Sequence, residues 1–296
     1  MARTPVASAE VERIERRRRE QGSDLVAVEE PLQILLEHGE AHARTEAPLA
    51  LTMRTPGQDR DLVTGFLFAE GVIGGVDDLM SVRHCKRSET PDNVVRAVLH
   101  ERVVVPSRLL ERTLTMTSAC GVCGERTLEA LSKAGCAPLR VKRDAFDPSV
   151  IRRALLALEE SQAWFRHTGG THGAALFNDA GELILHREDV GRHNALDKLV
   201  GAWLVGAAPD AAQAFVLVSS RASFELVQKT VRAGFPMLVA IGAASSLAIE
   251  TARRFDLTLL GFARENRFTV YSNSERVALE PSDPTTGSAF VQVEAG

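Results

Sequence analysis

Residues 214–271 read AFVLVSSRASFELVQKTVRAGFPMLVAIGAASSLAIETARRFDLTLLGFARENRFTVY. Short, continuous apolar runs alternate here with segments of helical length. The predicted strands are Ala214–Val218, Met237–Ile241, Leu257–Leu260 and Arg267–Tyr271, and the predicted helices are Phe224–Arg232 and Leu247–Arg254. Continuous apolar strands separated by helices are typical of a mostly parallel sheet that is covered on both faces. This stretch therefore predicts an α/β fold.

The residues before this stretch extend the same domain. Predicted helices span residues 148–166 and 192–205, and a predicted hairpin joins 174–177 to 182–186 through Asn178-Asp179-Ala180-Gly181. A turn of this composition between two apolar runs is a hairpin signal. Residues 145–276 are therefore predicted to form one α/β domain with a mixed or mostly parallel sheet.

The N-terminal part of the chain has a different character. Residues 23–117 are predicted to form a smaller, mixed α+β lobe with a helix over Asp59–Glu70, which Gly71 ends, and strand material over Asn93–Val105. Residues 118–144 are a loop and connector, and residues 1–22 and 277–296 are tails. In the first tail Arg16–Arg19 stand among glutamates, which favours a solvated, frayed helix over a nucleic-acid-binding arm.

Composition narrows the classes of function. The chain has 296 residues and a formal charge of −4, which gives no bulk attraction to nucleic acid or to an acidic membrane surface. The N-terminus lacks the apolar core of a secretory signal, and the longest apolar stretch, Met237–Ile249, is too short to span a bilayer. We therefore expect a cytoplasmic protein whose four cysteines are reduced thiols, metal ligands or catalytic groups.

Polar loops follow the predicted parallel strands. In an open α/β sheet, ligands bind beyond the carboxyl ends of the strands, where helix N-termini favour phosphate. The segments at those ends are Ser219–Ser223, Gly242–Ser246 and Gly261–Arg264. Candidate phosphate contacts are Ser219, Arg221, Ser245, Arg264 and Arg267, since arginine can bind phosphate through two hydrogen bonds. The alternative is that these residues are ordinary helix caps and surface arginines.

Two further segments concentrate glycine and polar residues. They are Thr168–Gly173 and Arg187–Asn194, and each contains a histidine, His172 and His193. Glycine lets the backbone approach a ligand closely, so either histidine is a candidate for a hydrogen bond to a substrate. A single histidine can equally be structural.

The segment Ser118-Ala119-Cys120-Gly121-Val122-Cys123-Gly124 is a C-x-x-C motif set among glycines, directly before a predicted helix. A thiol at a helix N-terminus has a lowered pKa, and the thiolate is its reactive form. A zinc site, a redox pair and a mobile sulfur carrier are all compatible with C-x-x-C. A zinc site normally needs a second pair of ligands, and Cys85 and Cys136 stand alone in the sequence, so we predict no metal site.

Seven segments together resemble one family, the formate dehydrogenase accessory sulfur carriers (FdhD/NarQ). They are GFLFAEGVI (65–73), SACGVCG (118–124), TGGTHGAAL (168–176), EDVGRHNALDKLVG (188–201), SSRASFELVQK (219–229), GAASSLAIETA (242–252) and GFARENRFTVY (261–271). The resemblance runs from about residue 24 to residue 276 and leaves out both tails.

The resemblance implies a cytidine deaminase-like fold and a sulfurtransferase activity. In such a protein a cysteine desulfurase loads sulfur onto the C-x-x-C, and the carrier passes it to the bis(molybdopterin guanine dinucleotide) molybdenum cofactor of formate dehydrogenase. Cys120 would hold the persulfide and Cys123 would assist it. The implied cofactor-binding residues are Phe262, Ala263, Arg264, Glu265, Asn266 and Arg267. A homodimer is also implied. The alternative is a chaperone that delivers the cofactor without sulfur chemistry.

Overall fold

The computed structural model describes residues 4–86, 88–106, 109, 114–116, 136–139, 146–206 and 210–278. Its strands form a six-stranded sheet, a five-stranded sheet and a two-stranded ribbon. Most of the predicted connector (118–144) and of the predicted C-terminal tail (277–296) lies outside the described residues. Cys120 and Cys123 are among the residues that are not described. No helix in the described ranges combines the length and the apolar character that a membrane crossing requires.

The six-stranded sheet has the order β13-β12-β11-β10-β8-β9. Its strands are β8 (His172–Asn178), β9 (Leu183–Asp189), β10 (Ala214–Val218), β11 (Met237–Ala240), β12 (Thr258–Arg264) and β13 (Arg267–Ser272). The predicted strands are confirmed, and β10, β11 and β12 are parallel. The other three strands pair antiparallel to their neighbours, so the sheet is mixed rather than mostly parallel. Short hairpins join β8 to β9 and β12 to β13, and a hairpin can only produce antiparallel neighbours.

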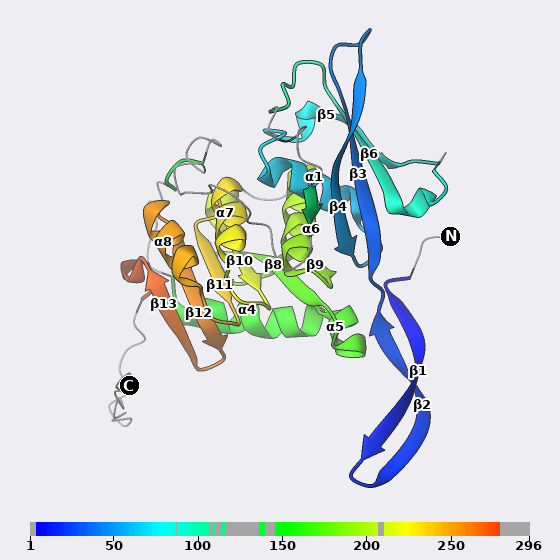
Figure 1. The fold of residues 1–296 in the computed structure, drawn as a ribbon. Coiled ribbons are helices and arrows are strands. Elements are labelled where there is room, and N and C mark those ends of the chain that lie inside the picture. Colours follow the sequence, from blue (N-terminus) through cyan, green and yellow to red (C-terminus); the bar gives the residue numbers. More distant parts are fainter. Residues whose placement is uncertain are drawn as a thin grey trace.

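Helices cover both faces of this sheet, as predicted (Figure 1). On one face α4 (Pro148–Ser161) packs on Phe215 and Leu217 of β10. On the other face lie α6 (Arg192–Val205), α7 (Phe224–Arg232) and α8 (Ser246–Arg254), against Val216 and Val218 of the same strand. Alternate side chains of a strand point to opposite faces, so both sets are buried. This double burial explains why the strand is apolar throughout.

The N-terminal lobe is a five-stranded sheet with the order β5-β6-β3-β4-β7. Its strands are β3 (Glu30–His38), β4 (Thr45–Arg54), β5 (Leu79–His84), β6 (Val94–Leu99) and β7 (Leu114–Met116). Pairs β3–β6 and β4–β7 are parallel, and pairs β3–β4 and β5–β6 are antiparallel. The predicted strand over residues 93–105 is too long, because pairing ends at Leu99. The predicted helix is confirmed as α1 (Asp59–Ala69).

Two glycines bring α1 against α6, and so join the two lobes. A Cβ atom on Gly65 would lie 1.9 Å from the carbonyl oxygen of Asp197, and one on Gly201 would lie 1.9 Å from the carbonyl oxygen of Asp61. Neither distance leaves room for a methyl group. The two helix backbones are therefore in direct contact at this crossing.

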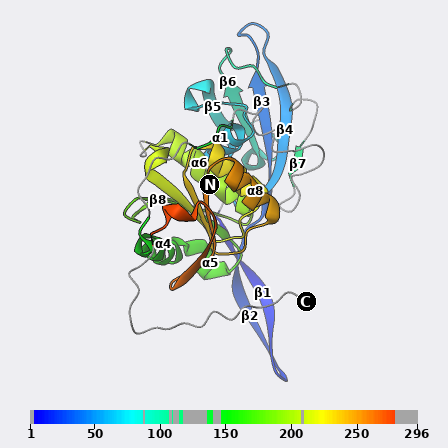
Figure 2. The same ribbon diagram turned by 90° about the vertical axis from the view of Figure 1, so that its left-hand side faces the viewer.

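The predicted helix in residues 1–22 is wrong. Strands β1 (Val6–Glu15) and β2 (Arg18–Ala27) form a long antiparallel ribbon, and the predicted tail boundary falls inside β2. The register sets Glu15 opposite Arg18 and Arg13 opposite Glu20. The mixed charges thus form cross-strand pairs of opposite sign, which stabilise a ribbon. Both views show the ribbon projecting away from the two lobes (Figures 1 and 2).

Candidate functional site

The two loops after β10 and β11 are held together by backbone hydrogen bonds. Gly242 N donates to Ser220 O, Ala222 N donates to Ala243 O, and Ser245 N donates to Ala222 O, each at 3.0 Å. The loops therefore form one rigid edge at the carboxyl ends of the parallel strands. The N-termini of α7 and α8 begin at this edge.

Three of the predicted phosphate contacts lie on this edge. Ser219 is half-buried and its Oγ accepts a hydrogen bond from Gly173 N at 2.9 Å, which ties β8 to β10. Ser245 is exposed and caps α8, because its Oγ accepts from Ala248 N at 3.3 Å. Arg221 is exposed and its side chain passes over Gly242, where a Cβ atom would lie 2.8 Å from Arg221 Cγ. The structure thus brings these residues together, and their binding of phosphate stays a prediction.

The two predicted histidines lie at the same edge. His172 begins β8, and burial lowers its pKa, with the nearby charges of Arg192 and His193 adding to the effect and Asp189 opposing it. A lowered pKa keeps this imidazole neutral at pH 7, so that one ring nitrogen can accept a hydrogen bond. His193 is buried near the start of α6. Its Nε2 lies 2.9 Å from Glu225 Oε2 and 3.3 Å from Ser223 Oγ, so the ring links α6 to α7.

The predicted cofactor-binding stretch forms the end of β12 and its turn into β13. Phe262 is 47% exposed and has a φ of +50°, a left-handed conformation that is uncommon for an aromatic residue. Its N–H donates to Gly242 O at 2.9 Å, and the sheet register is irregular between Gly261 and Arg264. Ala263 is buried beside it. This irregularity turns the Phe262 ring away from the core, at the border with the loop edge.

Arginines surround a cavity of about 360 Å³ beside this turn. Its lining residues include Arg152 of α4 together with Arg264, Glu265, Asn266 and Arg267. Arg152 Nε donates to Glu265 O at 2.9 Å, and Arg264 Nη1 donates to Ile241 O at 2.7 Å. Three guanidinium groups against one carboxylate make the cavity cationic, which suits a phosphorylated ligand.

The cysteines of the C-x-x-C motif lie outside the described residues, whereas Cys85 and Cys136 lie inside them. Burial raises the pKa of the Cys136 thiol, although the charge of Arg232 opposes the shift. Cys136 is therefore a thiol at neutral pH. Within the described ranges, no group of three or more histidine, cysteine, aspartate or glutamate side chains could hold a metal ion.

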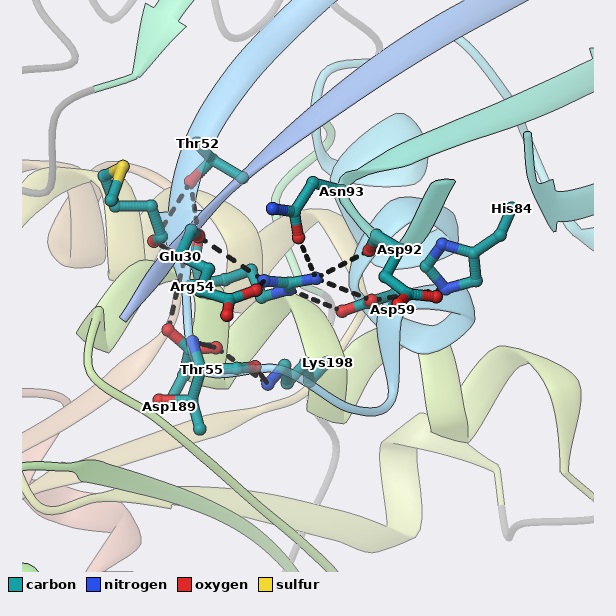
Figure 3. A network of polar contacts seen from close by, with 12 residues as sticks. Glu30, Thr52, Arg54, Thr55, Asp59, His84, Asp92, Asn93, Asp189 and Lys198 are labelled. Atoms are coloured by element: carbon teal, nitrogen blue, oxygen red, sulfur yellow. Dashed lines mark hydrogen bonds and ion pairs between the residues drawn. The ribbon is translucent and has the colours of Figure 1, made fainter. Parts of the chain in front are cut away.

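Part of the EDVGRHNALDK segment has a role that the sequence did not reveal. Asp189 is fully buried and accepts hydrogen bonds from Thr55 N at 3.2 Å and from Asn194 Nδ2 at 3.2 Å. Lys198 Nζ lies 2.7 Å from the same carboxylate and donates to Thr55 O at 2.9 Å. Thr55 belongs to the N-terminal lobe, so these side chains join the two lobes (Figure 3). The available signal was the spacing of Asn194 and Lys198, which places them on one helix face.

Glu188, the neighbour of Asp189, explains why the predicted helix over residues 148–166 is broken. One carboxylate accepts from Trp164 N at 2.9 Å, from Phe165 N at 2.7 Å and from Thr171 Oγ1 at 2.7 Å. It thereby caps a separate short helix, α5 (Ala163–Thr168), and the chain bends at Gln162. An acidic side chain is favoured at a helix N-terminus.

A second polar cluster lies inside the N-terminal lobe (Figure 3). The Arg54 guanidinium is 1% exposed and contacts both carboxylate oxygens of Asp59, at 2.9 and 3.1 Å. His84 Nε2 lies 3.3 Å from Asp59 Oδ2. Burial would raise the pKa of Asp59, but the hydrogen bonds from His84 and Arg54 outweigh it and lower the pKa. The same hydrogen bond raises the pKa of His84, against partial burial.

Comparison with known proteins matches most of the chain. The sequence model of the FdhD/NarQ family matches residues 27–278. A sulfur carrier protein FdhD from Streptomyces avermitilis is 43% identical over 265 residues, which cover 86% of this chain and 90% of the relative. One from Anaeromyxobacter dehalogenans is 44% identical over 268 residues, covering 86% and 89%. A solved structure from Desulfotalea psychrophila, described as a candidate formate dehydrogenase accessory protein, has the same fold. Its TM-score is 0.70 at 24% identity, and the match covers 93% of this chain and all of that one.

Proposed function

Because the chain belongs to the FdhD/NarQ family, we propose that it is a sulfur carrier that acts in the maturation of formate dehydrogenase. Relatives that are more than 40% identical over most of their length carry the name sulfur carrier protein, and this identity supports the proposal most directly. The protein would act on its partners as a homodimer in the cytoplasm.

The sulfur would travel on Cys120. The Cys120 thiolate attacks the terminal sulfur of a persulfide on a cysteine desulfurase. A new S–S bond forms, the S–S bond of the donor breaks, and the desulfurase cysteine leaves as a thiolate. In the second step the acceptor supplies an electron pair to the terminal sulfur and forms a bond to it, while the S–S bond on Cys120 breaks. Cys120 leaves as a thiolate and can be loaded again. Cys123 would assist this transfer.

The acceptor would be the molybdenum cofactor, bound as substrate through its guanine dinucleotide ends. The cationic cavity of Arg152, Arg264 and Arg267 supports this part of the proposal, because its charge is opposite to that of a diphosphate. The exposed ring of Phe262 lies at the border of the loop edge and could stack on a planar base. His172, Ser219 and Arg221 would contact the same ligand from the loop edge.

Mass spectrometry of the protein after incubation with a cysteine desulfurase and cysteine tests the sulfur chemistry. We expect a mass gain of one sulfur atom that a thiol reductant removes and that Cys120→Ala abolishes. Cys85→Ala is the matched control and should load normally. Normal loading of Cys120→Ala would contradict the assignment. Failure of the wild-type chain to load, together with tight cofactor binding, would favour the chaperone alternative.

Calorimetry with GDP tests the binding site separately. Loss of one charged hydrogen bond costs about 1.5–3 kcal/mol, or roughly ten- to a hundredfold in affinity. We expect Arg264→Ala and Arg267→Ala each to weaken GDP binding by that factor. Arg254→Ala removes an exposed arginine outside the cavity lining and should leave it unchanged. Unchanged affinity in both cavity variants would remove these residues from the site.

A further inference from the structure

A buried glutamine beside the loop edge carries an amide group whose hydrogen bonding is incomplete. Gln162, at the bend between α4 and α5, is 5% exposed, and within the described ranges its Nε2 atom has no hydrogen-bond partner. A buried donor without a partner destabilises the folded protein, and such groups are rare in native structures. An apolar side chain would avoid this cost. Retention of the amide therefore points to a partner that is not among these residues.

Gly173 brings this amide next to a predicted ligand contact. A Cβ atom on Gly173 would lie 2.9 Å from Gln162 Cδ and 3.0 Å from Nε2, so a side chain there would displace the amide. The N–H of the same glycine donates to Ser219 Oγ, and its carbonyl oxygen accepts from Ser219 N, each at 2.9 Å. Ser161 and Ala163 are half-buried, so the amide lies only one residue below the surface.

The amide and the arginine cavity lie on the same face of the six-stranded sheet. Leu217 belongs to the core under α4, and Ser219, two residues further along, faces the same side. Ile241 directly follows β11 and packs against this core, and its carbonyl oxygen accepts from Arg264 Nη1 at 2.7 Å. Arg264 also lines the cavity. Gln162 and the cavity are therefore the two ends of one row along this sheet edge.

The row has the length that a nucleotide needs. The strand order is β11-β10-β8, and neighbouring strands lie about 4.8 Å apart, so β8 is about 10 Å from β11. The Arg264 guanidinium reaches β11, and Gln162 lies on β8. This separation is on the order of that between a diphosphate and the base that it carries. A ligand held by its phosphates at Arg264 can thus bring a ring to Gln162.

The chemistry of the amide indicates which part of a ligand it suits. A carboxamide is neutral and offers two N–H donors and a carbonyl acceptor, whereas phosphate is better matched by arginine. Guanine and pterin share a 2-amino-oxopyrimidine ring, in which a carbonyl oxygen stands next to a ring N–H. The Nε2 group can donate to that oxygen while Oε1 accepts from the N–H.

We propose that Gln162 is a specificity-determining residue that recognises the 2-amino-oxopyrimidine ring of the bound ligand. On binding, the amide turns from Gly173 toward the ring and makes the hydrogen bonds that it lacks here. The inference rests on the proposed function, which supplies a ligand of this class, and it adds a neutral recognition group to the cationic cavity. A site that is built to hydrogen-bond a ligand discriminates strongly against ligands that lack the matching group.

Calorimetry with GDP, pyrophosphate and 6-hydroxymethylpterin tests this assignment. Pyrophosphate carries the phosphates without a ring, and the pterin carries the ring without phosphates. The variant is Gln162→Met, which keeps the length of the side chain and removes its amide. We expect weaker binding of GDP, of the pterin or of both by about two- to tenfold, the value of a neutral hydrogen bond, with pyrophosphate unchanged. Weaker GDP binding identifies guanine as the ring, and an effect on the pterin alone identifies pterin.

Thermal unfolding supplies a second readout. Gln162→Met removes an unsatisfied buried donor, so we expect an equal or higher melting temperature. A lower melting temperature without a ring-specific loss would identify a structural amide and overturn the inference. Gln213→Met is the matched control, because it makes the same change at an exposed position at the other end of β10, and it should alter neither readout.

The three probes also separate this inference from the proposed function. Equal weakening of all three would show a general disturbance of the site, and unchanged binding of GDP and the pterin would show that the ring lies elsewhere. Either result overturns the role of Gln162 and leaves the arginine cavity in place. A wild-type chain that binds no probe would overturn the role of Gln162 together with the proposed cofactor site. Sulfur loading of Cys120 is measured separately and decides neither result.

Discussion

The Asp59 carboxylate contacts two basic side chains, one buried and one partly exposed. Arg54 is enclosed by the protein, whereas the His84 side chain is 43% exposed. The folded pKa of His84 is raised above its usual value of 6.5, so its contribution to stability is complete below about pH 6.5 and is lost as pH rises through the folded value. The folded pKa of Asp59 is lowered, so its contribution is present above pH 3.8 and is lost as pH falls through the folded value.

We therefore expect His84→Gln to destabilise the protein at pH 6 and to have a smaller effect at pH 9. The difference should be under about 1 kcal/mol, because solvent screens a half-exposed ion pair. Urea unfolding at both pH values measures it. Arg83→Gln, at the neighbouring exposed position, should show no such pH dependence. An effect of His84→Gln that grows as pH rises would contradict the assigned pair.

The sequence identifies candidate site residues only where a local pattern of neighbouring residues points to them. Ser219 and Arg264 are predicted from the polar loops at strand ends, and His172 and His193 from segments rich in glycine and polar residues. The fold brings these residues to one edge of the sheet. Lys198 was not singled out, although it is fully buried. One of its partners, Thr55 O, lies in the other lobe, and a single sequence does not show which distant residue will supply a carbonyl oxygen.

The crossing of α1 and α6 depends on two small residues. Gly65→Ala and Gly201→Ala each place a methyl group about 1.9 Å from a backbone oxygen, which a rotamer change cannot relieve. We expect each to cost about 3 kcal/mol or more, at the upper end of overpacking. Urea unfolding followed by circular dichroism measures the loss. Gly75→Ala is the control, since nothing lies within 4 Å of its added Cβ atom. Near-wild-type stability of both helix variants would show that the helices can separate at little cost.

Helices and strands were most predictable where burial imposes a repeated pattern. Strands β10 and β11 are apolar throughout because helices cover both faces, and they appear at the predicted positions, while β12 continues beyond the predicted Leu260 to Arg264. The ribbon was missed because charged residues on exposed strands carry no burial signal. Ala7, Ala9 and Val11 do alternate with polar residues, which favours a strand, but the arginine run dominated the prediction. The bend at Gln162 was hidden because Glu188, which caps α5, lies far along the chain.

The two lobes share buried polar groups as well as apolar ones. Separation of the lobes would leave the Lys198 ammonium without Thr55 O and the Asp189 carboxylate without Thr55 N. Lys198 and Asp189 would keep their mutual ion pair, but each would lose a hydrogen-bond partner, and an unsatisfied buried polar group is unfavourable. We therefore expect a single cooperative thermal transition, with equal calorimetric and van't Hoff enthalpies. Thr55→Val keeps the backbone contacts and should preserve it, whereas Lys198→Met should lower the midpoint. Two resolved transitions in the wild type would show that the lobes unfold separately.

Two adjacent residues of β9 attach this strand to two different parts of the molecule. Glu188 caps the first turn of α5, the helix that contacts β2 of the N-terminal ribbon, while Asp189 binds the N-terminal lobe through Thr55. Both side chains are buried, so water does not compete for their hydrogen bonds. The strand thus connects α5 to the N-terminal lobe. One strand fixes both the start of α5 and the N-terminal lobe, and α6 begins three residues after it, at Arg192.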